Sequence, residues 1–574
     1  MSRRFAFRPT PLLLACLAAG AGPATWAAPT LQWQTVANMA TDAPGATNGA
    51  RFFSFNQPSV NDSGLVVMRA RARPPTGGGG GGAGEPVRGI FTRDMAGPGN
   101  PVLTIASNQT GFDLVPQPNN TGGTFNEFPA FPRIDARSDA VAFRGQSTPV
   151  YEYQVGVDPN TGEAITTRGG TSGVYTNPSG SLVTGTSLLG NVTNTIFPAN
   201  PDLSHFQVPG TTPGTRFDQF PGAPAITGST VVVKGNWNDG TSSQTGIYAR
   251  DVTASGGTAP TVKLAASGDS FANGAGTAVL GSTAPPSASD GRVVFTGLDN
   301  EAAPTAGGIF LTALSDAAHT LQRVVSIGIT AVGNGISETF RTIGEGLSFD
   351  RNKVGFWGSW GSETRPVTVN CPTDGNASLI NACRTQDNNG TAGDGVYTFD
   401  VPLHQGFFVA DVDTGALKMV AQTGAGFDDF LFWTFSGAPD DAGEGDGDAS
   451  REPPRWRSSA FMAIDDVLGE VFKAHNDDDL FGLYGDFGDG VVTLLEEGMD
   501  GSLVDPAAAG MAITSLGIER DGFRNGWLAI NASMANADAG WAGVYITRVP
   551  EPTPLATLAL GLAVLGLTRR ARRA

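Results

Sequence analysis

Aspartate residues recur at the start of several short apolar stretches, and carboxylates at repeated positions have the clearest potential for chemistry in this sequence. If those stretches surrounded a channel, their carboxylates would form a ring of oxygen ligands suited to Ca²⁺. Aspartate also begins turns, because its side chain accepts hydrogen bonds from the backbone that follows, and we favour this interpretation. Ca²⁺ is therefore kept as a candidate ligand, no metal-binding residue is assigned, and no other cofactor is expected. The aspartates are Asp62, Asp290, Asp350, Asp466 and Asp521.

The sequence contains none of the local motifs of the common catalytic sites. Its four histidines do not fall in paired-ligand spacings such as H-E-x-x-H, and no G-x-S-x-G turn marks a nucleophilic serine. Walker, Rossmann and C-x-x-C patterns are also missing. We assign no catalytic residue and favour a non-catalytic protein. The two carboxylates of a glycosidase follow no spacing rule, so a glycosidase or polysaccharide lyase remains the alternative.

Four tryptophans lie at or near the ends of predicted strands, where aromatic side chains could form a ligand-binding face. Exposed aromatic rings in such positions can stack on sugars. Packing between neighbouring sheets is the alternative role, and it is the one we favour, since tryptophan is mostly buried in proteins. The residues are Trp237, Trp357, Trp360 and Trp541.

Two cysteines, Cys371 and Cys383, remain if the N-terminal segment with Cys16 is removed. In an exported protein such a pair usually forms a disulfide. A zinc site would need two further ligands, and neither a second cysteine pair nor a nearby histidine is present. We therefore predict a disulfide between them.

One phrase returns seven times along the chain: a turn, a short apolar strand, and then a tag of the type Gly-Ile/Val-Phe/Tyr. A further strand follows each tag, and a Phe-rich segment leads into the next copy, which makes four strands per copy. A single four-stranded sheet cannot bury both faces, so sheets arranged around a ring must cover each other. The tags are residues 89–91, 173–175, 246–248, 308–310, either 395–397 or 406–408, 482–484, and 543–545.

These repeats predict an all-β protein, a β-propeller of seven four-stranded blades over residues 28–548, with six or eight blades as alternatives. In the sixth copy the first strand could be residues 461–465 or 471–474. The last copy lacks its third strand, and residues 31–45 resemble the missing piece, so we expect an N-terminal strand to close the ring. Long hairpins in copies one, two and five would crowd on one face, which is either a binding face or a set of variable surface loops.

Both ends of the chain predict export. Residues 1–27 have the basic start, apolar stretch and small residues of a signal peptide. Near the other end, the apolar run Leu555–Leu567 is predicted to form a short transmembrane helix, although at about 1.5 Å per residue it falls short of a ~30 Å hydrocarbon core. The arginines behind it would stay in the cytoplasm and stop transfer. They are Arg569, Arg570, Arg572 and Arg573.

The tail 549–574 resembles the PEP-CTERM sorting signal of Gram-negative bacteria. The resemblance rests on Val549-Pro550-Glu551-Pro552, the apolar run and the arginines, in that order. It implies recognition by an exosortase, a membrane-embedded enzyme that removes the tail while the protein is sorted from the inner membrane to the cell surface or extracellular matrix. Proteins with this signal often accompany exopolysaccharide.

The 574-residue chain carries a formal charge of −18, which argues against binding to nucleic acid. The favoured interpretation is an exported surface or matrix protein whose propeller binds exopolysaccharide or another surface protein. Because an acidic protein repels anionic glycans, we expect a neutral glycan, a protein, or an anionic glycan bridged by Ca²⁺. A purely structural matrix protein is a further alternative.

Overall fold

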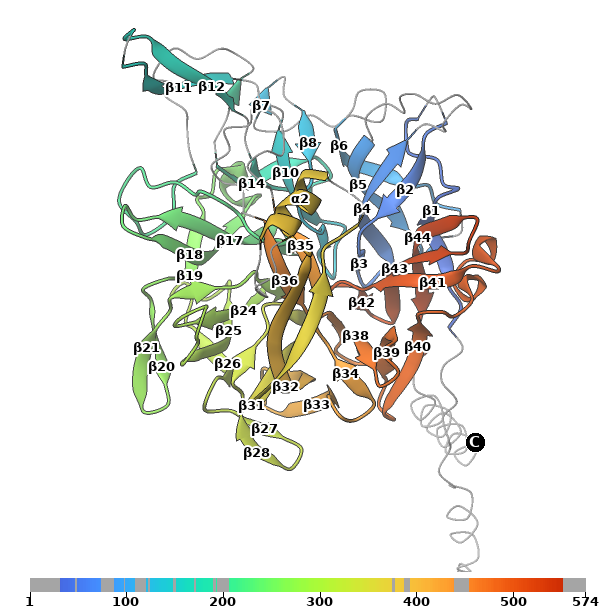
Figure 1. Ribbon diagram of the computed structural model, residues 1–574. Helices are drawn as coiled ribbons and strands as arrows, with labels where there is room; N and C mark the ends of the chain where they lie inside the picture. The colour runs from blue at the N-terminus through green and yellow to red at the C-terminus, as the bar shows by residue number, and fades with distance from the viewer. Residues whose placement is uncertain are drawn as a thin grey trace, which may run out of the picture. The chain divides into compact units, whose positions relative to one another are not determined.

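Seven sheets with one shared strand order make up the computed structural model of this chain (Figure 1). They belong to one compact unit that begins at Leu31. The structure describes residues 31–46, 49–73, 87–97, 99–108, 120–121, 124–147, 151–159, 161–169, 172–188, 192–193, 206–373, 377–386, 393–437 and 454–550. The predicted signal peptide and residues 551–574 lie outside this range. No helix of the described part is long and apolar enough to cross a membrane.

Each sheet is a blade of four strand positions in which the innermost position is usually divided into two short pieces. Blade 1 has β2 (Arg51–Phe55), β3 (Ser59–Val60), β4 (Leu65–Arg73), β5 (Val87–Asp94) and β6 (Leu103–Ser107). Blade 2 has β8 (Phe125–Glu127), β9 (Arg133–Ile134), β10 (Val141–Ser147), β13 (Ser172–Thr176) and β14 (Val183–Ser187). Blade 3 has β16 (Ala225–Thr227), β17 (Thr230–Asn238), β18 (Ser243–Asp251) and β19 (Val262–Ala266).

The remaining four blades follow the same plan. Blade 4 has β22 (Ser282–Thr283), β23 (Ser287–Ser289), β24 (Arg292–Leu298), β25 (Gly307–Ala313) and β26 (Gln322–Ser326). Blade 5 has β29 (Thr342–Ile343), β30 (Ser348–Asp350), β31 (Lys353–Asn370), β32 (Val396–Asp411) and β33 (Leu417–Gln422). Blade 6 has β34 (Phe427–Asp429), β37 (Met462–Asp465), β38 (Gly469–Asn476), β39 (Phe481–Asp486) and β40 (Val491–Glu496). Blade 7 has β41 (Ala512–Gly517), β42 (Phe523–Arg524), β43 (Trp527–Ala535), β44 (Gly540–Arg548) and β1 (Gln34–Asn38).

The innermost strands contact one another in a closed circle, which confirms a propeller of seven blades. The order of contacts is β3, β9, β16, β23, β30, β37, β42 and back to β3. The repeat phrase predicts that the strand after each turn is the first strand of its blade. In the structure that strand is the second, counted from the centre of the ring. The residues read as a turn before it form the innermost strand, which is only two residues long in β3 and four in β37. In the sixth copy both predicted segments are therefore strands, the innermost β37 and the second β38.

In every blade the tag in the third strand lies opposite a β-bulge in the outermost strand. In all seven blades the outermost strand has one extra residue opposite the second and third tag residues, and in blade 7 this residue is Val36 of β1. The aromatic ring two residues after the glycine leaves no space for a larger residue: a Cβ on Gly89 would lie 2.5 Å from Phe91, and one on Gly543 would lie 2.6 Å from the Tyr545 hydroxyl. In the fifth copy the bulge lies opposite 406–408, which settles the two predicted alternatives.

The N-terminal strand closes the ring, as predicted. Strand β1 pairs antiparallel with β44 and is the outermost strand of blade 7. Val36 and Ala37 are fully buried in an apolar core shared with blade 1. Arg93 of blade 1 donates hydrogen bonds to the carbonyl oxygens of Val36 at 2.6 Å and Thr35 at 3.2 Å. The first described strand is thus fixed by blades at both ends of the chain.

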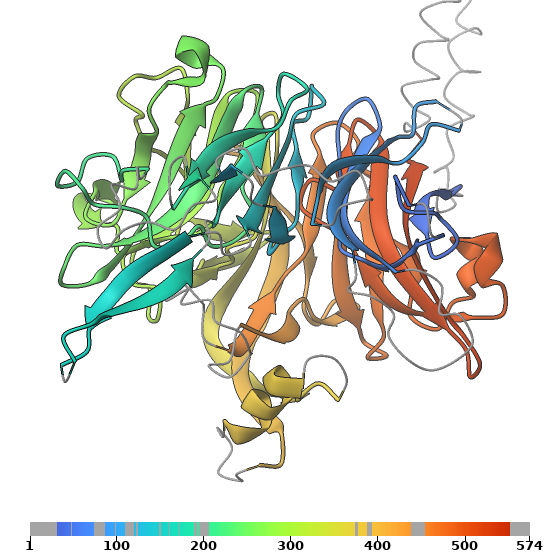
Figure 2. The ribbon, with the colours of Figure 1, turned by 90° about the horizontal axis from the view of Figure 1, so that it is seen from above.

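The two ends of the blades differ, because neighbouring strands are antiparallel. Second and third strands are joined at one end, which we call the insertion face. Each innermost strand turns into its second strand at the opposite end, which we call the turn face. Figure 2 shows the hairpin around residues 151–169 (cyan) and the segment around residues 361–400 (yellow) projecting from the same side of the unit.

Further elements connect or extend the blades. The first copy's predicted insertion, residues 74–86, lies outside the described residues. The described additions are β11 (Tyr151–Val157) with β12 (Ala164–Gly169), β20 (Ser270–Asn273) with β21 (Gly276–Val279), β27 (Ala331–Gly333) with β28 (Ile336–Thr339), β35 (Phe432–Ser436) with β36 (Arg455–Ser459), β7 (Asn120–Thr121) with β15 (Val192–Thr193), α2 (Ala377–Thr385), η1 (Ala254–Gly257), η2 (Gly501–Leu503) and η3 (Pro506–Ala508).

Candidate functional site

Two hairpins form a lobe on the insertion face of blade 5, which we call the hairpin lobe (residues 361–373, 377–386, 393–401, 432–437 and 454–459). Strands β31 and β32 stay paired beyond the blade as far as Asn370 and Val396. The hairpin β35–β36 packs on them through aromatic side chains: Phe399 stacks on Trp433 at 4.5 Å between ring centroids. Alternate residues on the other side of β31, including Thr364 and Thr368, are exposed. The lobe therefore has an aromatic interior and a polar outer surface.

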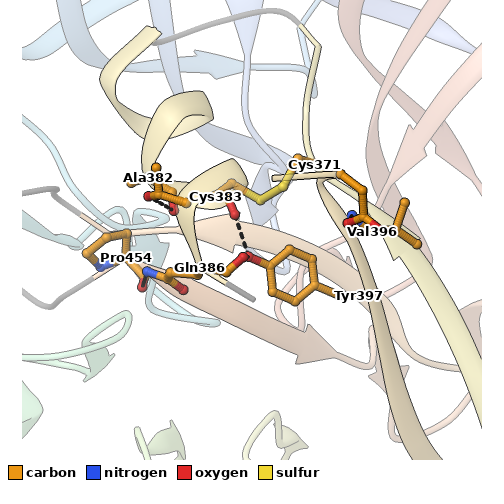
Figure 3. The surroundings of a disulfide bond; sticks show 9 residues. Cys371, Ala382, Cys383, Gln386, Val396, Tyr397 and Pro454 are labelled. Carbon is orange, nitrogen blue, oxygen red and sulfur yellow. Dashed lines mark hydrogen bonds between the residues drawn. A yellow bond between two sulfur atoms is a disulfide. The ribbon is translucent and has the colours of Figure 1, made fainter. Parts of the chain in front are cut away.

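A disulfide fixes the tip of the hairpin lobe (Figure 3). Cys371 and Cys383 are bonded, with 5.9 Å between their Cα atoms, and both are buried. The helix α2 carries Cys383, and the Tyr397 hydroxyl donates to the carbonyl oxygens of Cys383 and Gln386. The predicted disulfide is confirmed, and the hydroxyl of Tyr397 holds the end of α2 against β32.

Reduction of this disulfide should open the lobe without unfolding the ring. The bond spans 12 residues of sequence. Closing a loop of this size stabilises it by about 2 kcal/mol or more, which is roughly 30-fold in the opening equilibrium. We therefore expect the double variant Cys371→Ser, Cys383→Ser to be cleaved in the lobe about 30-fold faster by a dilute protease, with the ring left intact. Under non-reducing mass spectrometry the parent should be two hydrogens lighter than its reduced form, and free thiols in exported protein would contradict the prediction.

Two of the four tryptophans considered for a ligand-binding face are buried. Trp357 is 8% exposed and donates to Oε1 of Gln405 at 2.9 Å, and Trp360 is 4% exposed. The ring of Trp360 is parallel to that of His404 at 6.0 Å and edge-on to Phe408. Neither tryptophan has enough exposed surface to stack on a sugar, which favours the packing alternative for both.

The other two tryptophans are partly exposed but are held by hydrogen bonds. Trp237 donates from Nε1 to the Tyr248 hydroxyl at 2.9 Å. Trp541 donates to Oδ2 of Asp505 at 2.9 Å, and Asp505 also accepts from the Tyr545 hydroxyl. Burial raises the pKa of Tyr248 well above its usual value, so its hydroxyl remains a neutral partner for Trp237. The four tryptophans lie on three strands in three blades, β17, β31 and β44, and the structure does not bring them together into one patch.

A shallow depression of about 470 Å³ lies on the insertion face between blades 4 and 5. The hairpin β27–β28 forms one wall with Glu338, and Gly361 at the start of the hairpin lobe forms another. Arg341 is exposed and donates to the carbonyl oxygen of Gly361 at 3.1 Å. Hydroxyl, carboxylate and guanidinium groups thus meet over an apolar floor. The lining residues are Pro304, Ile327, Gly328, Ser337, Glu338, Thr339, Phe340, Arg341 and Gly361.

Near the turn face, aspartates of the innermost strands meet arginines from other blades. Arg524 is 2% exposed and donates to the backbone carbonyl oxygens of Ile464 at 2.8 Å and Phe349 at 3.0 Å. Its Nη2 lies 2.5 Å from Oδ1 of Asp521. Burial alone would lower the pKa of Arg524, but Asp521 and further carboxylates, of which Asp350 is the next largest influence, outweigh burial and raise it. One guanidinium therefore joins blades 5, 6 and 7.

Further ion pairs extend these contacts around the ring, and we call the whole set of arginines and carboxylates the axial network. Arg133 of blade 2 is 2% exposed and lies 2.8 Å from both Glu519 and Asp521 of blade 7. Arg351 of blade 5 lies 2.5 Å from Asp466 of blade 6 and 3.5 Å from Asp62 of blade 1. These contacts place three of the predicted aspartates in one network.

Of the other two aspartates, Asp290 lies outside this network and Asp350 belongs to it. Asp290 forms a more exposed pair with Arg137 at 2.6 Å. Asp350 joins Asp465 and Asp466 in a group whose oxygens all lie within 4.8 Å of one another, a spacing that could suit a cation. Several of these oxygens already have partners, since Asp350 accepts from the backbone N–H of Asp466 and Asp465 accepts from that of Gly526. With Arg351 and Arg524 beside it, this group is part of the ion-pair network, and we assign it no metal.

The fold itself places the chain in the class of seven-bladed β-propellers, and comparison with known proteins adds nothing to that class. No family model and no curated protein matches the sequence. Three similar solved structures are an oligogalacturonate lyase in complex with manganese (9% identity, 91% of this chain and 97% of that chain, TM-score 0.34), the periplasmic gluconolactonase PpgL of Pseudomonas aeruginosa (10%, 76% and 84%, 0.27), and the α-L-arabinofuranosidase Arb93A of Fusarium graminearum (10%, 90% and 98%, 0.26). At these identities and TM-scores the likenesses carry no argument about activity.

Proposed function

We propose that this chain is an exported cell-surface or matrix protein that binds its partner through the insertion face and has no catalytic role. The observation that supports this most directly is the depression between blades 4 and 5, which is flanked by the hairpin lobe. Both are built from segments added to the four-strand plan. Long insertions on one end of a repeat architecture commonly form its binding surface.

The proposed route to the surface starts with the signal peptide, residues 1–27. The tail 549–574 then holds the precursor at the inner membrane until an exosortase recognises Val549-Pro550-Glu551-Pro552. The arginines from Arg569 onward stop transfer during this step. The motif itself supports this proposal, since its three parts occur in the order typical of the signal.

The chemistry of the depression favours a neutral, hydroxyl-rich ligand. Ser337, Thr339 and Glu338 offer hydrogen-bond acceptors and donors, and Arg341 offers a guanidinium with one bond already made to the protein. The net charge of −18 disfavours an anionic polysaccharide unless Ca²⁺ lies between the two. A neutral glycan is therefore the first candidate, followed by a protein and by a calcium-bridged anionic glycan.

A glycan array with and without Ca²⁺, run beside a reducing-sugar release assay, tests the proposal. We expect saturable binding and no sugar release. Arg341→Ala should weaken binding about tenfold, because one hydrogen bond from a charged group contributes about 1.5 kcal/mol or more. Arg137→Ala is the matched control, since Arg137 is an exposed arginine of the turn face and its loss should leave binding unchanged.

Other outcomes would favour the alternative classes. Released sugar would contradict the non-catalytic role and favour a lyase or glycosidase. If the protein is exported normally but neither binds a glycan nor releases sugar, a structural matrix protein would be favoured. Equal loss of binding in Arg341→Ala and Arg137→Ala would place the binding surface elsewhere.

A further inference from the structure

The folded blade continues without interruption to the first residue of the sorting motif. Strand β44 ends at Arg548, and Val549 follows it directly. Val549 is 4% exposed, packs in the core that contains Leu468 and Leu528, and donates its backbone N–H to the carbonyl oxygen of Gly526 at 2.8 Å. Pro550 is the next residue and is exposed. The described structure therefore leaves no linker between the propeller and the motif.

The chain leaves the propeller at the turn face. Gly526 lies in the turn between β42 and β43, which joins an innermost strand to a second strand. The neighbouring Asn525 donates to the backbone carbonyl oxygen of Asp62, in the equivalent turn of blade 1. The hairpin lobe and the depression extend from the opposite end of their blades. The motif and the proposed binding surface are thus on opposite faces.

The surface around this exit has an apolar residue that has no role in the core. Val467, in the corresponding turn of blade 6, is 63% exposed, the largest value among the large apolar side chains described. Its neighbour Leu468 is adjacent to the exit, because a Cβ added to Gly526 would lie 3.1 Å from Leu468. Arg548 lies over the ring of Trp527 at 4.5 Å and is exposed. An exposed valine and an exposed arginine on the same face suit the boundary between lipid and water.

We propose that the precursor is held with its turn face against the inner membrane and its insertion face pointing away from it. This inference rests on the proposed sorting function of the tail. From Pro550 to the apolar run at Leu555 there are five residues, which span at most about 17 Å even when fully extended. A propeller on so short a tether cannot turn its other face to the lipid.

The orientation can be measured by labelling single cysteines in spheroplasts. The motif variant Pro550→Ala, Glu551→Ala, Pro552→Ala provides unprocessed precursor, and the cysteines are introduced as Val467→Cys on the turn face or Ala537→Cys in the β43–β44 hairpin of the insertion face. A bulky polyethylene-glycol maleimide should label Val467→Cys about tenfold more slowly in the membrane-held precursor than in a soluble chain ending at Pro550, because the short tether excludes the polymer. Labelling of Ala537→Cys should be the same in both.

A spacer variant separates orientation from any local effect of the tail. Val549 is kept, and a Gly/Ser spacer of about ten residues followed by a second valine is inserted before Pro550, which should restore fast labelling of Val467→Cys. Equal labelling of Val467→Cys in the held and soluble forms would overturn the orientation alone. If the precursor is not retained in carbonate-washed membranes, or if the motif variant reaches the surface normally, the sorting proposal fails and the orientation fails with it.

Discussion

A chain that lacks residues 31–36 should be less stable to urea by about 5 kcal/mol or more and should aggregate as it unfolds. The deletion removes Val36 from a fully buried site and takes away the first three of the 5 residues of β1, so blade 7 loses most of its outermost strand. Burial of one valine contributes about 2 kcal/mol, and each lost backbone hydrogen bond about 1 kcal/mol more. Arg93 would also lose its two carbonyl partners on β1. Urea unfolding followed by circular dichroism measures the difference.

The matched control for this deletion is a chain that begins at Leu31. It keeps every residue of β1 and should unfold at the same urea concentration as the chain that begins after the signal peptide. Without β1, the edge of β44 is exposed and offers unpaired N–H and C=O groups to other molecules. Light scattering during refolding should therefore rise with protein concentration for the deletion variant alone. If the deletion variant and the control had the same midpoint, the strand would not close the ring.

The second large effect that we expect is that Arg524→Met lowers the free energy of unfolding by about 4 kcal/mol. The guanidinium bonds to backbone carbonyl oxygens in two other blades and pairs with Asp521. Its loss leaves Asp521 paired only with Arg133 and leaves Asp350 without its nearest positive charge. Removing one partner of a buried ion pair typically costs 3–5 kcal/mol. Arg137→Met is the control, since Arg137 pairs with Asp290 at the surface, where such pairs contribute about 0–1 kcal/mol.

The pH dependence of this variant has a defined sign. Burial and Asp350 raise the pKa of Asp62, while Arg351 and Arg524 lower it, so loss of Arg524 should raise it further. A carboxyl whose pKa is raised by folding stabilises the fold below its unfolded pKa of about 4, and this contribution is lost as the pH rises through the folded pKa. The stability deficit of Arg524→Met should therefore be largest at pH 7 and smaller near pH 4. A deficit that grew on acidification would contradict the proposed electrostatic cause.

The repeat pattern predicted the blades, and its Phe-rich segment at 125–132 contains β8, but it assigned the second piece of most innermost strands to a turn. Second and third strands are seven to nine residues long in most blades, and their apolar runs and tags are visible in the sequence. An innermost piece such as Ser59–Val60 or Phe523–Arg524 is too short to show a period of two residues. Both pieces are fully buried, and what makes them strands is pairing with the second strand and contact with the neighbouring blade.

The axial network could be predicted only in part, because its partners are far apart in the sequence. The aspartates were recognisable as a repeated position, but the arginines were not. Asp62 meets Arg351, and Arg133 meets Asp521, 388 residues away. Such pairs form because the blades are arranged in a circle, and the residues around each partner in the sequence do not indicate them. The depression between blades 4 and 5 was missed for the same reason, since it forms where a connecting hairpin meets the next blade.

The closure of blade 7 has a consequence for the timing of folding. The Thr547 hydroxyl bonds to the carbonyl oxygen of Gln32, 515 residues earlier in the chain, so the first strand to leave the ribosome must wait for the last. Contacts of such separation form late and slowly. Val549 packs in the same core as Tyr545 and Ile530 of this blade. Burial of the residue before Pro550 therefore requires the strands of blade 7, and a chain whose synthesis has not yet reached β44 cannot bury it.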